Sequence, residues 1–250
     1  MAKSRFHKLT KWMLWIHRYT GFVLSLLFLF WFISGFVMMY KDFPYLSRAE
    51  SLQHKASIPH QGSTVHQKIL DEFASDKNWE SIKIAGLLGQ SVYQFQDGKG
   101  DLACFFADTG EKVVIDENEA KKVALHFIEN KHSIKDVVYM DELDQWTPRT
   151  RFIPYLPAYK VHIDDGQGTV CYVSSVTGEV FQKLNTSDKV WAWLGAIPHW
   201  IYFKDLRIHT QLWRDIVVTL SILGTIMCIA GLYIGVIRVK LKKAKLLRFL

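Results

Sequence analysis

The sequence predicts an α+β membrane protein in which two transmembrane helices flank one extramembrane lobe. Two apolar runs of 22 residues, Tyr19 to Tyr40 and Ile216 to Ile237, contain no charged residue. At about 1.5 Å per residue each run reaches roughly 33 Å, enough to cross a hydrocarbon core of about 30 Å. The long segment between the runs is mostly polar and contains two similar β-rich stretches.

The basic residues at the two ends of the chain predict the orientation of these helices. Residues 1–11 and 238–250 hold 10 of the 31 lysines and arginines and no Asp or Glu. By the positive-inside rule both termini are cytoplasmic. The rest of the chain has 21 basic against 24 acidic residues, so the net charge of +7 reflects topology and not a nucleic-acid partner.

The first apolar run is longer than the 7–15 apolar residues of a signal peptide, and Ser34 to Pro44 offers no small-x-small cleavage site. We therefore expect an uncleaved signal anchor in a bacterial inner membrane, with the lobe in the periplasm. Aromatic residues suited to the headgroup layer support this placement. At the inner edge they are Trp12, Trp15 and Tyr19, and at the outer edge Tyr40, Phe43, Tyr45, Trp191, Trp193, Trp200 and Trp213.

An internal repeat organises the lobe. Val92 to Val113 and Ala158 to Phe181 each read as strand, turn, strand, turn, strand. Asp97-Gly98 and Asp165-Gly166 predict two-residue hairpin turns with positive φ, and Thr109-Gly110 and Thr177-Gly178 mark the next reversals. Similar hairpins also arise by chance, but a helical pattern precedes each one, at Ser63 to Phe73 and at Asn118 to Ile128, with Ser63 and Asp116 as caps.

The two units are too small to bury a generous core separately, so we expect them to pack as one lobe. The three cysteines form no CxxC or zinc spacing. Cys104 and Cys171 are either a disulfide or two buried strand thiols, and Cys228 lies in the second span.

The arrangement of the lobe resembles the PepSY fold, and two motifs resemble those of PepSY-associated membrane proteins. The first is His17-Arg18-Tyr19-Thr20-Gly21, and the second is LGAIPHWIYFKDLR from Leu194 to Arg207. The resemblance covers Lys11 to about Arg238. Larger members continue into further spans, so this chain is expected either to be a two-span member or to obtain the rest of its helical bundle elsewhere.

The predicted organisation has seven segments: a basic cytoplasmic tail at 1–11, a transmembrane helix at 12–43, PepSY-like units at 44–115 and 116–190, an amphipathic membrane-surface segment at 191–212, a transmembrane helix at 213–238 and a basic tail at 239–250.

The resemblance implies a haem-binding membrane reductase, and the histidines are the candidate ligands. A b-type haem needs axial imidazoles, small residues beside the macrocycle and cations near its propionates. His17 has Gly21 one turn away on the same helix face and Arg18 beside it. The alternative is an interfacial histidine near a basic flank.

His209 is the second candidate metal ligand, with Arg207 and Arg214 as propionate partners. His199 belongs to the family-like segment and is a further candidate for cofactor binding, although it also suits an amphipathic element resting on the membrane. The other lobe histidines show no metal spacing. Gly224, Gly231 and Gly235 form a small-residue stripe that suits either close helix packing or a flat cofactor.

His17 and His209 lie at opposite membrane faces, roughly 30 Å apart, so they cannot bind one haem together. Haem binding therefore requires a second ligand from a second copy of the chain, in a homodimer, or from a partner membrane subunit. No Asp, Glu or Lys lies inside either run, which disfavours an ion transporter.

The leading functional hypothesis is a haem b subunit that transfers electrons across the membrane, of the ferric-siderophore-reductase or respiratory accessory type. The rival is a haem-free membrane anchor whose lobe docks on or regulates a periplasmic or membrane-complex partner. A third possibility is a purely structural subunit of a membrane assembly. No nucleophile, base and orienting group share a catalytic spacing, so the lobe is not expected to be an enzyme.

Overall fold

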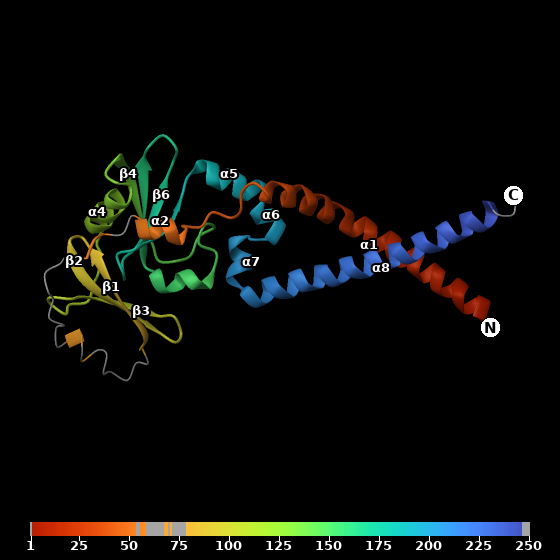
Figure 1. The fold of residues 1–250 in the computed structure, drawn as a ribbon, viewed down its shortest axis with the longest axis horizontal. Coiled ribbons are helices and arrows are strands. Elements are labelled where there is room, and N and C mark those ends of the chain that lie inside the picture. The colour runs from red at the N-terminus through yellow and green to blue at the C-terminus, as the bar shows by residue number, and fades with distance from the viewer. Residues whose placement is uncertain (1, 54–55, 59–67, 70, 72–78, 247–250) are drawn as a thin grey trace.

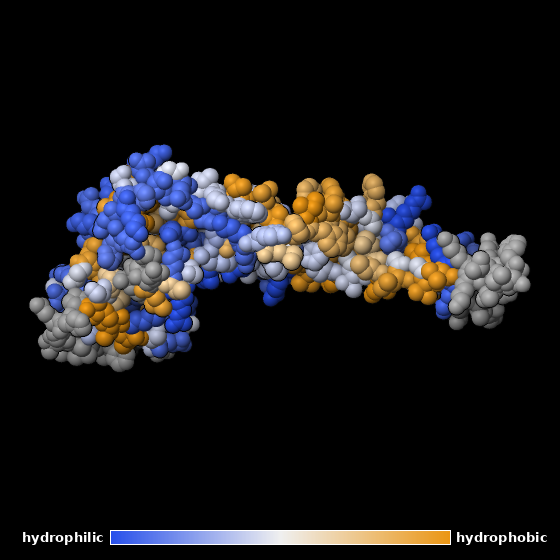
Figure 2. All heavy atoms as spheres, turned by 45° about the horizontal axis from the view of Figure 1, so that its top comes forward, coloured by the Kyte–Doolittle hydropathy of each residue, from blue (hydrophilic) through white to orange (hydrophobic). Residues whose placement is uncertain are grey.

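The computed structural model describes residues 2–53, 56–58, 68–69, 71 and 79–246. The molecule is elongated, with the lobe at one end and two long helices extending from it (Figure 1). These are α1 (Ala2–Met38) and α8 (Thr210–Leu246), which run antiparallel and cross, so both termini lie at the end far from the lobe. Apolar side chains cover the helical part between the hydrophilic lobe and the basic helix ends (Figure 2).

The two helices meet along a seam of alternating three- and four-residue spacing. On α1 the seam includes His17, Gly21, Leu24 and Phe28, and on α8 it includes Gly224, Met227, Gly231 and Ile234. This spacing keeps one narrow face of each helix toward the other. Gly224 lies against the ring of Phe28, where an ideal Cβ would stand 2.9 Å from Cζ. The remaining faces are apolar and exposed, as expected for contact with lipid.

The lobe contains two antiparallel sheets, one from each predicted unit. The first has the order β1 (Trp79–Leu87), β2 (Gln90–Asp97), β3 (Leu102–Phe106). The second has the order β4 (Ser133–Met140), β5 (Ala158–Asp164), β6 (Val170–Ser174), β7 (Val180–Leu184). Before it comes α4 (Glu117–Phe127), where Asp116 forms the predicted cap in a capping box with Glu119. The predicted helix at 63–73 lies mostly outside the described residues.

Strands β1 and β4 were missed by the sequence analysis, and the third strand predicted in the first unit is reduced to a single bridge, Phe105 to Lys112. Both missed strands pair with the first strand of a predicted hairpin, β1 with β2 and β4 with β5. Many of their side chains are exposed, so little apolar alternation marks them in the sequence.

The prediction of two-residue turns at the Asp-Gly pairs is wrong. Four residues separate β2 from β3, and positive φ occurs at Gly100 and not at Gly98. Five residues separate β5 from β6, but Gly166 does have the predicted positive φ, at 68°. The Asp97 carboxylate accepts hydrogen bonds from the backbone of Lys99 and Asp101, which stabilises a longer Asx-type loop. Asp165 closes the β5–β6 loop in the same way. The Thr-Gly reversals are confirmed, because Gly110 and Gly178 have φ of 65° and 67°.

The two units share one hydrophobic core, as predicted. It joins Leu87 and Val92 of the first sheet to Val123 of α4 and Val173 of the second sheet. Cys104 and Cys171 both lie in this core as free thiols in β3 and β6, so the disulfide alternative does not apply in this structure.

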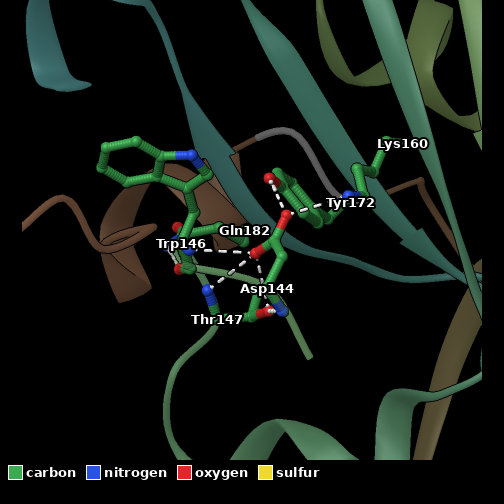
Figure 3. A network of polar contacts seen from close by, with 6 residues as sticks. All are labelled: Asp144, Trp146, Thr147, Lys160, Tyr172 and Gln182. Atoms are coloured by element: carbon green, nitrogen blue, oxygen red, sulfur yellow. Dashed lines mark hydrogen bonds and ion pairs between the residues drawn. The ribbon is translucent and has the colours of Figure 1, made fainter. Parts of the chain in front are cut away.

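Gln182 attaches the segment that follows α1 to the second sheet, and Figure 3 shows its contact with Trp146. Gln182 of β7 is 0% exposed and donates to the carbonyls of Pro44 and Trp146 at 2.9 and 3.0 Å. Its own side-chain oxygen accepts from the backbone of Leu46. Because a buried amide needs such partners, this side chain helps to hold the chain between α1 and the lobe in place.

Asp144 anchors the adjacent loop. Its carboxylate accepts from the Tyr172 hydroxyl at 2.8 Å and pairs with the Lys160 ammonium at 3.0 Å (Figure 3). The backbone N–H groups of Trp146 and Thr147 donate to its other oxygen. Burial alone would raise the pKa of this carboxyl, but the Lys160 charge and the hydrogen bonds of Lys160 and Tyr172 lower it below its usual range.

Short helices lie between the described strands of the lobe and the spans: α2 (Arg48–Gln53), α5 (Thr186–Leu194), α6 (Ala196–Trp200) and α7 (Lys204–Ile208). The 3-10 helix η1 (Thr150–Tyr155) lies within the lobe, between β4 and β5. Helices α5 and α6 contact the lobe-side end of α1, and α7 contacts α8. Buried Phe43, Ile197 and Tyr202 form a small core there. The predicted membrane-surface segment is therefore folded against the spans.

Candidate functional site

Two histidines each pack against a glycine of a facing helix. His17 of α1 lies against α8, where an ideal Cβ at Gly231 would stand 2.8 Å from His17 Cε1. Its Nδ1 is 3.2 Å from the carbonyl oxygen of Met227, one turn before that glycine. A side chain at position 231 would displace the imidazole from this position.

His199 of α6 repeats this arrangement on α1. An ideal Cβ at Gly35 would stand 3.0 Å from His199 Cε1, and Nδ1 is 3.2 Å from the carbonyl oxygen of Trp31, again one turn before the glycine. The imidazole stacks on the Trp31 ring with centroids 5.1 Å apart and planes at 14°. The Ser34 hydroxyl lies 3.3 Å from the same nitrogen.

These contacts indicate which ring nitrogen carries a hydrogen in each imidazole. A carbonyl oxygen can only accept a hydrogen bond, so Nδ1 carries the hydrogen in His17 and in His199. Nε2 then has the free lone pair. Metal-binding histidines are oriented in this way, with the second ring nitrogen donating to a backbone carbonyl.

The two histidines lie at different levels of the membrane-spanning part. His199 packs beside Ser34 and Gly35, which are 17 and 18 residues after His17 on α1, so the two levels are separated by about 26 Å. One haem cannot reach both. Over the described residues, no three His, Cys, Asp or Glu side chains come together as a metal site.

His209 occupies a different setting. It ends α7, its side chain is exposed, and its carbonyl accepts from the backbone N–H of Trp213. The structure does not bring His209 together with His17, in agreement with the predicted separation of the two.

The other predicted site residues are placed as follows. Gly21 shares the seam face with His17, but the space beside it is filled, because an ideal Cβ would lie 3.7 Å from Met227 Sδ. Arg18 is exposed. Arg207 stacks on the Trp213 ring at 4.4 Å, and Arg214 is exposed with its Nε 4.0 Å from the Asp215 carboxylate.

The glycine stripe is only partly a contact surface. Gly224 and Gly231, seven residues apart, face α1, whereas nothing lies within 4 Å of an ideal Cβ at Gly235. The sequence did not predict the contact of His199 with Gly35, although His199 belongs to the second family-like motif and Gly35 to the first apolar run. A glycine in an otherwise bulky apolar span was the available signal.

The lobe itself contains a depression of about 200 Å³ between the two units. Its lining is mostly apolar and includes Leu87, Val123, Phe127 and Val180, and His126 also lines it. No grouping of nucleophile, base and orienting residue accompanies it among the residues described.

Comparison with known proteins places the chain in a family. Neither the curated proteins nor the solved structures contain a match to it. A family model described as "PepSY-associated TM region" matches residues 14–249, a range that contains both charge-free apolar runs, both glycine-packed histidines and the described lobe. The chain therefore belongs to the PepSY-associated transmembrane family and is a membrane protein.

Proposed function

We propose that this chain is a haem-binding subunit that transfers electrons across the membrane, with His17 and His199 each supplying one axial imidazole. The carrying observation is the repeated arrangement of Nδ1 donating to a helix carbonyl, which leaves Nε2 with its lone pair at two levels of the span. The family resemblance points to the ferric-siderophore-reductase or respiratory accessory type.

The residues present fit one axial position at each level. Each imidazole is held in a single tautomer and backed by a glycine, so its orientation is set before any ligand arrives. Haem b would supply one-electron redox chemistry at these positions. His199 replaces His209 as the outer ligand in this proposal, because among the described residues the His209 ring makes no contact with a helix carbonyl like those of His17 and His199.

The second ligand at each level is assigned to another protein chain. The His17 side chain is exposed along the helix pair, so a second copy of this chain or a partner membrane subunit has access to it. A symmetric dimer would place two His17 side chains at one level. We assign both termini to the cytoplasm of a bacterial inner-membrane protein and the lobe to the periplasm, in accordance with the basic tails.

The test is a dithionite-reduced minus oxidised spectrum of the full-length protein purified in detergent with its native partners, with haem quantified per chain. Three matched variants, His17→Phe, His199→Phe and His209→Phe, keep a ring but remove the ligating nitrogen. We expect a sharp α-band in the wild type and in His209→Phe, and loss of part of the signal in each of the other two. A flat spectrum in a folded wild-type sample, or equal signals in all variants, would refute the proposal.

The same contacts also suit a second candidate function, in which both histidines only hold the helices together. N–H to carbonyl bonds between helices stabilise membrane bundles without a cofactor, typically by about 0.6 kcal/mol each. The lobe also offers a mostly apolar depression of about 200 Å³. The chain would then be a haem-free anchor whose lobe docks on or regulates a partner. A flat spectrum combined with co-purification of a stoichiometric partner would support this function.

A further inference from the structure

Three arginines gather around two tyrosines where the lobe meets the spans. The Arg149 guanidinium carbon lies 4.8 Å from the Tyr45 ring centroid and 5.5 Å from that of Tyr202. Arg151 lies 5.0 Å from Tyr45, and Arg207 lies 5.4 Å from Tyr202. The three charges therefore share two aromatic rings.

This arginine cluster, Arg149, Arg151 and Arg207, lacks a balancing acid. Among the described residues no carboxylate lies within ion-pair distance of any of the three guanidinium groups. Asp42 acts electrostatically on Tyr45, but it does not pair with the arginines. Burial, and next the charge of Arg149, lower the pKa of Arg151, as expected for like charges held close together.

The hydrogen-bonding capacity of the cluster is also largely unused. Nε of Arg149 and Nε of Arg207 are buried and have no hydrogen-bond partner in the structure. One N–H of Arg149 donates to the Tyr202 hydroxyl at 3.0 Å, and one of Arg207 contacts the Thr210 hydroxyl at 3.3 Å. A guanidinium presents five N–H donors in a fork that suits phosphate oxygens, so several donors remain available.

The position of the cluster identifies the anion. Tyr202 packs with Phe43 and Trp213, at the lobe-side ends of α1 and α8. Trp191, Trp193, Trp200 and Phe203 are exposed in the neighbouring short helices, as aromatic residues are at the headgroup level of a bilayer. Phospholipid phosphates are the anions concentrated in that layer.

We propose that Arg149, Arg151 and Arg207 bind the phosphate of an anionic phospholipid in the leaflet on the lobe side. The stacked rings hold the guanidinium groups in place, and their N–H edges receive the phosphate oxygens. The bound lipid would offset part of the positive charge of the cluster and tie the η1 segment of the lobe to α7. This site is independent of any haem.

The test is native mass spectrometry of the delipidated full-length protein, titrated with phosphatidylglycerol or with zwitterionic phosphatidylcholine. We expect one phosphatidylglycerol to be retained in preference to phosphatidylcholine, and Arg149→Gln with Arg151→Gln to weaken this binding by about tenfold or more. Arg151→Gln alone changes an exposed side chain and should weaken it without affecting the fold, which far-UV circular dichroism checks.

Arg214→Gln is the matched control, because Arg214 is exposed at the same end of α8 but stands outside the cluster. It should bind phosphatidylglycerol as the wild type does. Equal retention of the two lipids, or equal weakening by Arg214→Gln, would overturn the proposal. Displacement of the lipid by excess inorganic phosphate would assign the site to free phosphate and would also overturn it.

Discussion

Replacing Gly231 by leucine inserts a side chain where the His17 imidazole now lies. An ideal Cβ at this position would be 2.8 Å from His17 Cε1 and 3.1 Å from Nδ1, so the ring must leave the seam and its bond to the Met227 carbonyl is lost. Gly235→Leu is the matched control, because nothing lies within 4 Å of an ideal Cβ there.

The two variants gain about the same intrinsic helix propensity, roughly 1 kcal/mol, so this contribution cancels in their difference. Overpacking costs about 1–3 kcal/mol, and the lost interhelical hydrogen bond about 0.6 kcal/mol, up to about 1.7. We therefore expect Gly231→Leu to be less stable than Gly235→Leu by about 2–4 kcal/mol, or roughly 30- to 800-fold in the unfolding equilibrium.

The assay is equilibrium unfolding of the full-length protein by increasing SDS in mixed micelles, followed by tryptophan fluorescence. Gly231→Leu should unfold at a clearly lower SDS fraction than Gly235→Leu, and the control should unfold at or slightly above the SDS fraction of the wild type, because it gains helix propensity without a clash. Identical midpoints for the two leucine variants would refute the assigned register between α1 and α8.

Further predictions concern the lobe, measured in the full-length protein. Tyr172→Phe removes a 2.8 Å hydrogen bond to the Asp144 carboxylate and should destabilise the lobe by about 1.5–3 kcal/mol in urea unfolding; an unchanged midpoint would contradict the anchoring role. Burial would raise the pKa of Asp144, but the Lys160 charge and the hydrogen bonds outweigh it, so the pKa is lowered in the folded protein. The stability that Asp144 gives the lobe is therefore complete above the unfolded pKa of about 3.9 and is lost as the pH falls through the folded pKa. Urea midpoints should therefore decline below about pH 4, and less steeply in Asp144→Asn. Burial raises the pKa of Cys104 and Cys171 to about 12, so iodoacetamide at about pH 8 should label both only after unfolding, as mass spectrometry would show.

The sequence predicted the elements whose signal is local. Two charge-free runs of 22 residues mark the spans, and Thr-Gly pairs mark reversals because glycine adopts positive φ without strain. Strands β1 and β4 were missed because their pairing with β2 and β5 defines them, and their own side chains are largely exposed. The Asp-Gly loops were misread because an aspartate side chain can close a longer loop as well as a tight turn.

The candidate site depended on a register that a single sequence does not contain. Gly231 and Gly235 are equivalent in the string GLYIG, yet only Gly231 faces His17. Gly21 was correctly placed on the face of His17, but the free space predicted there is filled by Met227 from the other helix. Which small residue meets which large one is decided by the crossing of α1 and α8, and hence by tertiary packing.

The position of His199 bears on the choice between a ligand and a purely structural contact. Its ring lies beside Ser34 and Gly35, which belong to the uncharged run of the first span. Its Nδ1 is satisfied by the Trp31 carbonyl, while Nε2 has no hydrogen-bond partner among the described residues. A packing role uses only Nδ1, whereas the proposed haem would bind through Nε2. His199→Ser separates the two roles, because a serine hydroxyl can donate to a helix carbonyl but provides no imidazole ligand. The variant should keep the fold and lose the part of the haem signal that is assigned to His199.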